Sequence, residues 1–209
     1  SKTVAGDKAF NWQQEFPQIF NPSLREGTTK QSADVKQGFD VVIGNPPYVR
    51  AELLTSYLGY FEKNYLVYHS ASDLFAYFYE LGSKIINENG LMGYISNTFD
   101  KTTAGKVLRE YLTNKTSLKE YIDFTEVQIF EGATTYPVII ILESGVGKSS
   151  EFKYIKIPKI AQSRVIDIDN ENEIQVLQSS LNSNAWSFLS VGRANVFNKI
   201  LQHTNLREK

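Results

Sequence analysis

The sequence has no cysteine among its 209 residues. Disulfide bridges and thiolate metal sites are therefore excluded, and the composition fits a cytoplasmic location, because disulfides form in oxidising compartments. No apolar run approaches the ~20 residues that cross a bilayer, and the beginning is too polar for a secretory signal, so no membrane partner is expected. An excess of one charge is also missing, since 22 Lys and Arg stand against 23 Asp and Glu. This balance excludes a surface that is basic all over, but not a local basic cleft.

Recognisable metal and nucleotide loops are missing as well. Asp167 and Asp169 begin like a calcium loop, but the central glycine and the closing glutamate are absent. The Gly-Lys-Ser at residues 147–149 is like the end of a phosphate-binding loop, yet Leu142 stands where that motif needs a glycine. We therefore predict no metal site.

The most informative stretch is residues 39–48, an apolar run of strand type followed by Asn45-Pro46-Pro47-Tyr48. Each proline lacks an N–H and fixes φ, so neither continues a strand or enters a helix interior. The residue before each proline is held in extended backbone. A stiff tetrapeptide is thus expected at the carboxyl end of a buried strand, where open α/β sheets bind ligands. This tetrapeptide offers the side-chain oxygen of Asn45, backbone carbonyls without an obligatory partner and the flat ring of Tyr48. Such a set is typical of a clamp for a planar NH2 group. The simpler interpretation is a strand terminator with a core tyrosine.

The rest of the chain alternates helical and strand patterns, which predicts an α/β fold. Three helices are expected: one at residues 50–63, one that begins at Asp73 as N-cap and ends at Asn89-Gly90 as C-cap, and one at 103–112. Strands are expected at residues 39–43, 91–96, 118–124, 136–142 and 152–157. Strand, helix and strand in one sheet imply right-handed parallel crossovers. Only a loop separates the strands at 118–124 and 136–142, so these must pair antiparallel. A mostly parallel sheet with one antiparallel strand follows.

Both ends of the chain differ from this middle. Residues 1–38 form an approach segment. Its aromatic residues lie around a proline and are expected to dock onto the sheet; they belong to the stretches 10–12 and 16–20. Beyond Pro158 the sequence becomes acidic and polar before an apolar stretch at 174–181 that has a helical pattern. We predict one domain over residues 1–157, and a linker with the start of another domain over 158–209.

The order of these stretches resembles the second half of TaqI-like adenine-specific DNA methyltransferases, which occur alone or within type II restriction-modification enzymes. The resemblance rests on residues 38–48, residues 73–78 at a helix start, residues 89–95, and residues 130–132 before an apolar strand. It implies the second half of a Rossmann-like sheet that uses S-adenosylmethionine. The cofactor-binding first half is expected to be absent, because no glycine-rich turn precedes the motif. The region from residue 158 would then begin a target-recognition domain.

The resemblance also assigns roles to the substrate-binding residues. The four residues Asn45, Pro46, Pro47 and Tyr48 would form the catalytic motif. Within it, Asn45 and Pro46 would hold the amino group of an adenine flipped out of double-stranded DNA. Tyr48 would stack on that base. Phe130 would form the second aromatic wall, although a loop anchor beneath the sheet is an equal interpretation for it. Tyr136 replaces Phe130 if the loop register differs.

For the cofactor, the resemblance places Asn45, Asp73 and Phe78 beside S-adenosylmethionine. Periodicity alone explains Asp73 and Phe78 as parts of a capped amphipathic helix. Because the cofactor pocket is incomplete, the chain is expected to be inactive alone and to continue into further domains of one polypeptide.

Three alternatives stay open from the sequence. Release-factor glutamine methyltransferases and some RNA methyltransferases share the Asn-Pro-Pro-Tyr motif, because a carboxamide is also a planar NH2 group. A non-catalytic DNA-binding fragment is the other alternative, and a fused nuclease is left open. Four basic residues lie near the strand ends that are expected to face the ligand: Arg50, Lys101, Lys106 and Arg109. For each of them, a side chain exposed to solvent is the favoured interpretation, and contact with a DNA phosphate is the alternative.

Overall fold

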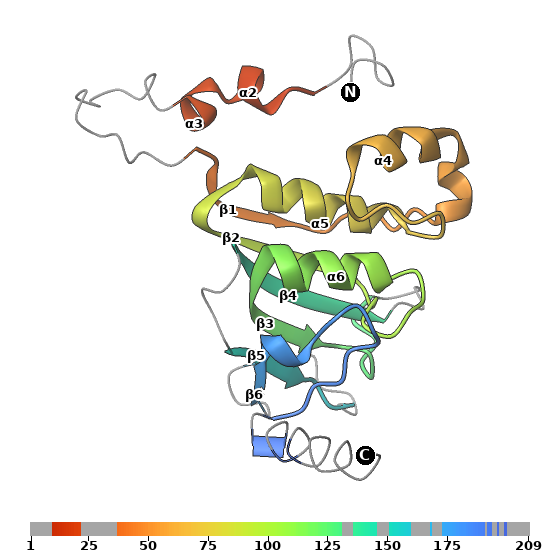
Figure 1. Ribbon diagram of the computed structural model, residues 1–209, viewed down its shortest axis with the longest axis vertical. Helices are drawn as coiled ribbons and strands as arrows, with labels where there is room; N and C mark the ends of the chain where they lie inside the picture. Colours follow the sequence, from red (N-terminus) through yellow and green to blue (C-terminus); the bar gives the residue numbers. More distant parts are fainter. Residues whose placement is uncertain are drawn as a thin grey trace, which may run out of the picture.

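The computed structural model describes residues 10–21, 37–130, 136–145, 151–159, 168 and 173–190, with positions 192, 193, 196 and 199. Within them the chain forms one six-stranded mixed sheet with helices packed on it (Figure 1). The strands are β1 (Phe39–Gly44), β2 (Ile86–Asn97), β3 (Thr116–Asp123), β4 (Pro137–Ser144), β5 (Glu151–Lys156) and β6 (Glu173–Leu177). Their order in the sheet is β1-β2-β4-β3-β5-β6. The predicted α/β class is confirmed.

Helices precede, connect and follow these strands. They are α2 (Trp12–Glu15), α3 (Pro17–Phe20), α4 (Leu58–Asn64), α5 (Leu74–Ile85) and α6 (Lys106–Lys115), with 3-10 helices η3 (Ala51–Tyr57) and η5 (Gln178–Ser180). The helix predicted over residues 50–63 is therefore present, but its first half has the tighter 3-10 geometry. No helix among the described residues is both long and apolar enough to span a bilayer.

The strand directions confirm one prediction and correct another. β4 runs antiparallel to both of its neighbours, β2 and β3, as the short connection requires. β1 is parallel to β2, and β3 is parallel to β5. The sheet has a second antiparallel strand, however, because β6 pairs with β5 where a helix was predicted at 174–181. Ile174 and Val176 point inward while Glu173 and Gln175 are exposed, which is the two-residue alternation of a strand.

The predicted C-cap at Asn89-Gly90 is wrong. Helix α5 ends at Ile85, and β2 begins with the next residue. Asn89 has a φ of 74°, and the pairing of β1 with β2 shifts register between Phe39 and Val41. The left-handed residue therefore forms an irregularity inside β2, a position where Asn is tolerated.

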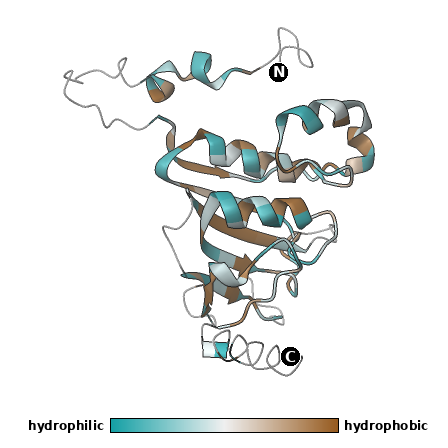
Figure 2. Ribbon diagram, viewed as in Figure 1, coloured by the Kyte–Doolittle hydropathy of each residue, from teal (hydrophilic) through white to brown (hydrophobic). Residues whose placement is uncertain are grey.

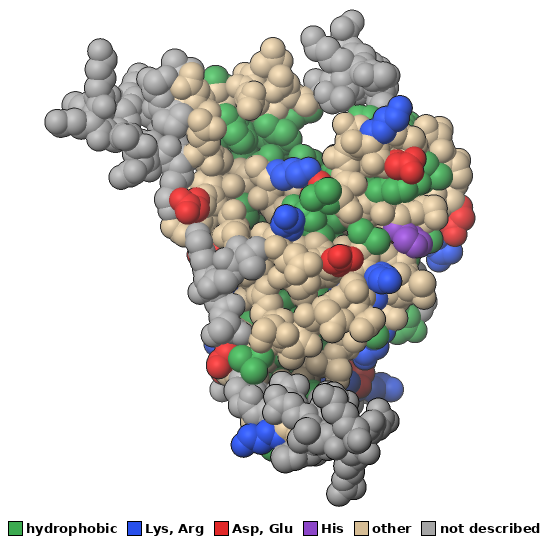
Figure 3. Space-filling view, in the orientation of Figure 1, with side chains coloured by type: hydrophobic (Ala, Val, Ile, Leu, Met, Phe, Trp, Pro, Cys, Tyr) green, Lys and Arg blue, Asp and Glu red, His purple; other side chains and the backbone are tan. Residues whose placement is uncertain are grey.

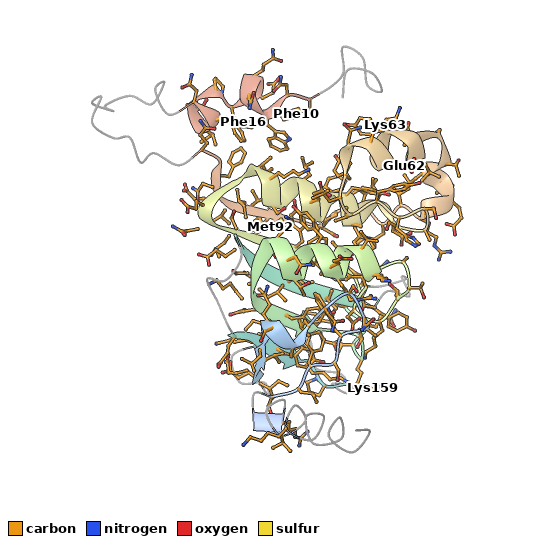
Figure 4. The ribbon with its side chains drawn as sticks, in the orientation of Figure 1. Phe10, Phe16, Glu62, Lys63, Met92 and Lys159 are labelled. Carbon is orange, nitrogen blue, oxygen red and sulfur yellow. The ribbon has the colours of Figure 1, made fainter. Side chains whose placement is uncertain are left out.

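The main core lies between the sheet and helices α5 and α6, which lie on the same side of it in Figure 1. Figure 2 shows hydrophobic strands beneath helices whose outer faces are hydrophilic. Val138, Ile140 and Leu142 of β4 are fully buried against this layer. Gly82 allows α5 to approach β2 closely, because a Cβ at that position would collide with Met92, labelled in Figure 4.

The residues after β6 belong to the same core. Trp186 and Phe188 pack against rings of β3 and β5, and the Phe188 ring stacks on Tyr154 with 4.3 Å between centroids. The boundary predicted after Ile157 therefore does not separate residues 173–190 from the sheet. These residues complete it.

At the other end of the chain, α2 and α3 carry the predicted aromatic docking. The rings of Trp12, Phe16 and Phe20 surround Phe39, with centroids 5.4–5.8 Å away. Figure 4 shows Phe10 and Phe16 on this segment. On the face of β1 opposite to the helices, Val41 and Ile43 are 59% and 81% exposed, so that part of the sheet has an open apolar surface.

Candidate active site

The Asn-Pro-Pro-Tyr motif leaves the carboxyl end of β1. The last residue of that strand, Gly44, pairs with Tyr94 of β2. Because the two strands are parallel, the motif stands beside the carboxyl end of β2, at Asn97. Asn45 and Pro47 are exposed, and Pro46 is buried. The motif thus follows the carboxyl end of a strand, as predicted. The expectation that this strand is buried is wrong, because β1 lies at an edge of the described sheet and none of its residues is fully buried.

Two hydrogen bonds fix the residues after the motif to the start of α5. The Leu74 N–H donates to the Val49 carbonyl over 2.9 Å, and the Ala51 N–H donates to Asp73 Oδ1 over 3.0 Å. Asp73 occupies the predicted N-cap position, but its side chain bonds the motif loop and makes no cap within its own helix. Helix α5 thus holds the motif loop in place.

The Asp73 carboxyl has a perturbed pKa. Burial raises the pKa, and the charge of Glu52 adds to this rise. The Ala51 N–H and the Arg50 guanidinium act in the opposite direction, because both stabilise the ionised form.

Tyr48 is half-buried, with its hydroxyl directed into the protein. The hydroxyl oxygen is buried and has no hydrogen-bond partner among the residues that the structure describes. Burial raises the pKa of Tyr48. Burial also raises the pKa of Tyr79, and the interaction with Tyr48 adds to that rise. Tyr79 lies fully buried behind it, with its hydroxyl 3.0 Å from Ser96 Oγ. The polar end of Tyr48 is therefore turned inward.

A cavity of about 400 Å³ adjoins the motif loop. Its lining consists of Arg50, Ala71, Ser72, Asp73, Phe75, Ala76, Asn97, Thr98, Phe99, Thr102, Ala104, Gly105, Leu108 and Tyr136. Residues from the motif loop, the start of α5, the end of β2, the loop after it and the start of β4 thus converge there. The Thr98 N–H donates to the Tyr136 carbonyl over 3.0 Å, which joins two of these segments. Apolar walls with a few polar groups are typical of ligand pockets.

The structure brings together some predicted site residues and leaves others apart. Asp73 and Tyr136 line the cavity, and Tyr136 is 55% exposed. Phe130 is half-buried in the loop after β3 and does not belong to the cavity lining. Phe78 packs against the main core. Asn45 is not part of the cavity lining, in which Arg50 is the residue nearest to the motif along the chain.

Sequence reasoning missed Asn97, Thr98 and Phe99 as cavity residues. The available signal was their position directly after a buried strand, at the edge where β1 also ends. Arg109 corrects another expectation. It is neither solvated nor free for phosphate, since it is only 3% exposed and its guanidinium binds backbone carbonyls.

Two of the residues that the resemblance assigns to S-adenosylmethionine have partners within the protein. The Asp73 carboxylate already accepts the Ala51 N–H, and the Phe78 ring is engaged in the core. The sequence before the motif has no glycine-rich turn for a cofactor.

Residues 1–130 match the Eco57I restriction-modification methylase family. This match covers more than half of the 209 residues. The chain belongs to the Eco57I restriction-modification methylase family.

Relatives of this Eco57I-family chain carry methyltransferase names. It is 34% identical over 109 residues to the type II methyltransferase M.BstVI of Geobacillus stearothermophilus, a match that covers 51% of the chain and 19% of that protein. It is 31% identical over 153 residues to the type II restriction enzyme and methyltransferase RM.Eco57I of Escherichia coli, covering 71% of the chain and 15% of that protein. The chain therefore spans less than a quarter of these relatives.

The fold also has a counterpart among solved structures. The type IIG restriction endonuclease BpuSI superimposes with a TM-score of 0.51 and 15% identity, over 68% of this chain and 19% of that one. The mixed α/β sheet of this Eco57I-family chain therefore shares its fold with part of that structure.

Proposed function

We propose that this chain is the substrate-binding half of a DNA adenine methyltransferase in a restriction-modification system. The reaction would transfer a methyl group from S-adenosylmethionine to the exocyclic amino group of adenine. The observation that carries the proposal is the position of the Asn45-Pro46-Pro47-Tyr48 motif at the end of β1, just before Arg50, which lines a cavity with aromatic residues in its walls. The names of the family and of its relatives support the reaction class.

The target base must leave the DNA stack before its amino group is accessible. Aromatic side chains recover part of the lost stacking energy, at about 1–3 kcal/mol per base. Tyr48 is the first such ring in this proposal. Tyr136 is the candidate for the second, because it is exposed at the cavity, and Phe130 is the candidate that requires movement of the loop after β3.

The amino nitrogen of adenine is conjugated with the ring and is a poor nucleophile. Acceptors at Asn45 and at the Pro46 carbonyl would bind its two hydrogens and favour a pyramidal nitrogen with a free lone pair. Fixed acceptor dipoles also stabilise the positive charge that develops on this nitrogen. Positioning therefore supplies the catalysis, and no strong base is needed in the motif.

Methyl transfer by the full-length polypeptide tests the proposal. Labelled S-adenosylmethionine is incubated with DNA, RNA and release factor, and we expect label on adenine N6 of DNA. Asn45→Ala should lower the rate by roughly a hundredfold to a thousandfold, because one preorganised hydrogen-bond partner of the reacting group is lost.

Asn114→Ala is the matched control, since Asn114 is an exposed asparagine at the far end of α6. Label on RNA or release factor alone would contradict the DNA substrate. Full activity in Asn45→Ala would contradict the mechanism for every substrate.

A further inference from the structure

The loop between β2 and α6 forms one wall of the cavity. Thr98, Phe99 and Thr102 of this loop line the cavity, and Gly105 ends it. Such a wall must keep its shape if a base is to be held for reaction, because a displacement of about 1 Å can slow catalysis a hundredfold.

Arg109 of α6 holds this loop from behind. Its Nη1 donates to the Phe99 carbonyl over 2.5 Å and to the Thr102 carbonyl over 2.8 Å. Its Nε donates to the Ser183 carbonyl over 3.1 Å, which lies 74 positions further along the chain. One guanidinium therefore joins two backbone carbonyls of the cavity loop to the segment after η5.

A second contact fastens the same loop to the same segment. The Trp186 N–H donates to the Asp100 carbonyl over 2.8 Å, and Trp186 is 2% exposed. The Asp100 carboxylate accepts a hydrogen bond from Thr98 Oγ1. Burial lowers the pKa of Arg109, and the charge of Asp100 acts in the opposite direction. The buried cation thus has a buried counter-charge nearby.

The loop packs tightly against Arg109 at Gly105. A Cβ added at Gly105 would collide with the Phe99 carbonyl and crowd Nη1 of Arg109 and Oγ1 of Thr102. Lysine cannot reproduce the arrangement either, because only the planar guanidinium presents several donors in a fixed fork.

We propose that Arg109 is a positioning residue for methyl transfer, which acts by fixing Phe99 and Thr102 in the cavity wall. This role rests on the function proposed above. Arg109 itself does not line the cavity, so its effect on the rate passes through the loop.

Arg109→Lys and Arg109→Gln in the full-length enzyme test the role, with two measurements. Hydrogen exchange at the amides of residues 98–106 reports the loop, and we expect it to rise about tenfold in both variants. The turnover number kcat at saturating DNA and cofactor should fall roughly tenfold to a hundredfold. The Kd for DNA should stay within about twofold, because Arg109 is buried and does not face a ligand.

Lys115→Gln is the matched control, since it removes an exposed cation from the same helix and should change neither measurement. If Arg109→Gln does not fold, the measurements on Arg109→Lys test the proposal alone. The lysine keeps a positive charge beside Asp100, so this variant is expected to fold. Gly105→Ala, which displaces the loop without changing any charge, should lower kcat in the same way.

An unchanged kcat in the folded Arg109→Lys variant would overturn the proposal, and so would unchanged exchange at residues 98–106. If the wild-type enzyme methylates no DNA, the proposed function fails. The exchange measurement still shows in that case whether Arg109 holds the loop.

Discussion

At the scale of single residues, the ring and the hydroxyl of Tyr48 differ in burial. Its ring is half-buried, whereas its hydroxyl oxygen is buried with no hydrogen-bond partner within the described part of the chain. An unsatisfied buried hydroxyl costs about 1–3 kcal/mol of folding free energy. Tyr48→Phe removes this cost and keeps the ring. We therefore expect the free energy of unfolding in urea to rise by about 1 kcal/mol, with methyl transfer at the wild-type rate.

Tyr48→Ala tests the ring itself. Loss of stacking worth about 1–3 kcal/mol should slow methyl transfer about fivefold to a hundredfold. Tyr57→Phe, at a 44% exposed tyrosine in η3, is the control and should change neither property. A Tyr48→Phe variant with lower stability than the wild type would mean that the hydroxyl does have a partner in the folded protein.

The sequence was sufficient to locate the motif because prolines act on their own neighbours. The extended backbone at residues 45–48 and its place after a strand follow from local rules alone. Arg109 was not predictable, because its partner Ser183 lies 74 positions away and a basic residue on a polar helix normally faces water. The choice between Phe130 and Tyr136 as the second wall stays a prediction, since loop register is not a local property.

At the scale of elements, one buried acid joins α5 to the segment after α4. Glu80 is fully buried and accepts the Val67 N–H over 2.9 Å, while Lys84 forms an ion pair with it one turn later. Glu80→Ala would leave the Val67 N–H unsatisfied, at a cost of about 1–3 kcal/mol in unfolding free energy. The ion pair adds little, because the Lys84 side chain is half exposed and regains water. Urea unfolding measures the loss.

Glu62→Ala is the control for this change. Glu62 is an exposed acid on α4, labelled in Figure 4, and its removal should leave stability within about 0.5 kcal/mol. Equal stability of Glu80→Ala and the wild type would contradict the role of Glu80 as a buried acceptor.

Most elements were predictable from periodicity, and the two errors have physical causes. Residues 89–90 have the composition of a helix C-cap, but Asn also takes a positive φ in irregular strands, and here it lies within β2. Residues 174–181 are a short apolar stretch, for which helix and strand patterns are hard to separate. Pairing with β5 decided in favour of a strand, and that partner is not visible in the stretch itself.

At the scale of the whole molecule, the sheet is unequally covered. Helices α5 and α6 cover one face, while Val41 and Ile43 on the other face of β1 remain exposed. Figure 3 shows Lys and Arg side chains dispersed among Asp and Glu on the face that it presents, in keeping with the balanced charge. Sheets that bind ligands at parallel strand ends are usually covered on both faces. The Asn45-Pro46-Pro47-Tyr48 motif thus follows directly after a strand whose residues Val41 and Ile43 are exposed.

This arrangement leads to a prediction about the cofactor. We expect the chain alone to bind S-adenosylmethionine weakly or not at all, because Asp73 and Phe78 are already engaged by Ala51 and by the core. Isothermal titration calorimetry should give no saturable heat in the micromolar range for the chain, whereas the full-length polypeptide in the same buffer should bind. Micromolar binding by the chain alone would contradict the prediction. The pocket would then be complete within these 209 residues, and the missing glycine-rich turn would not be needed to form it.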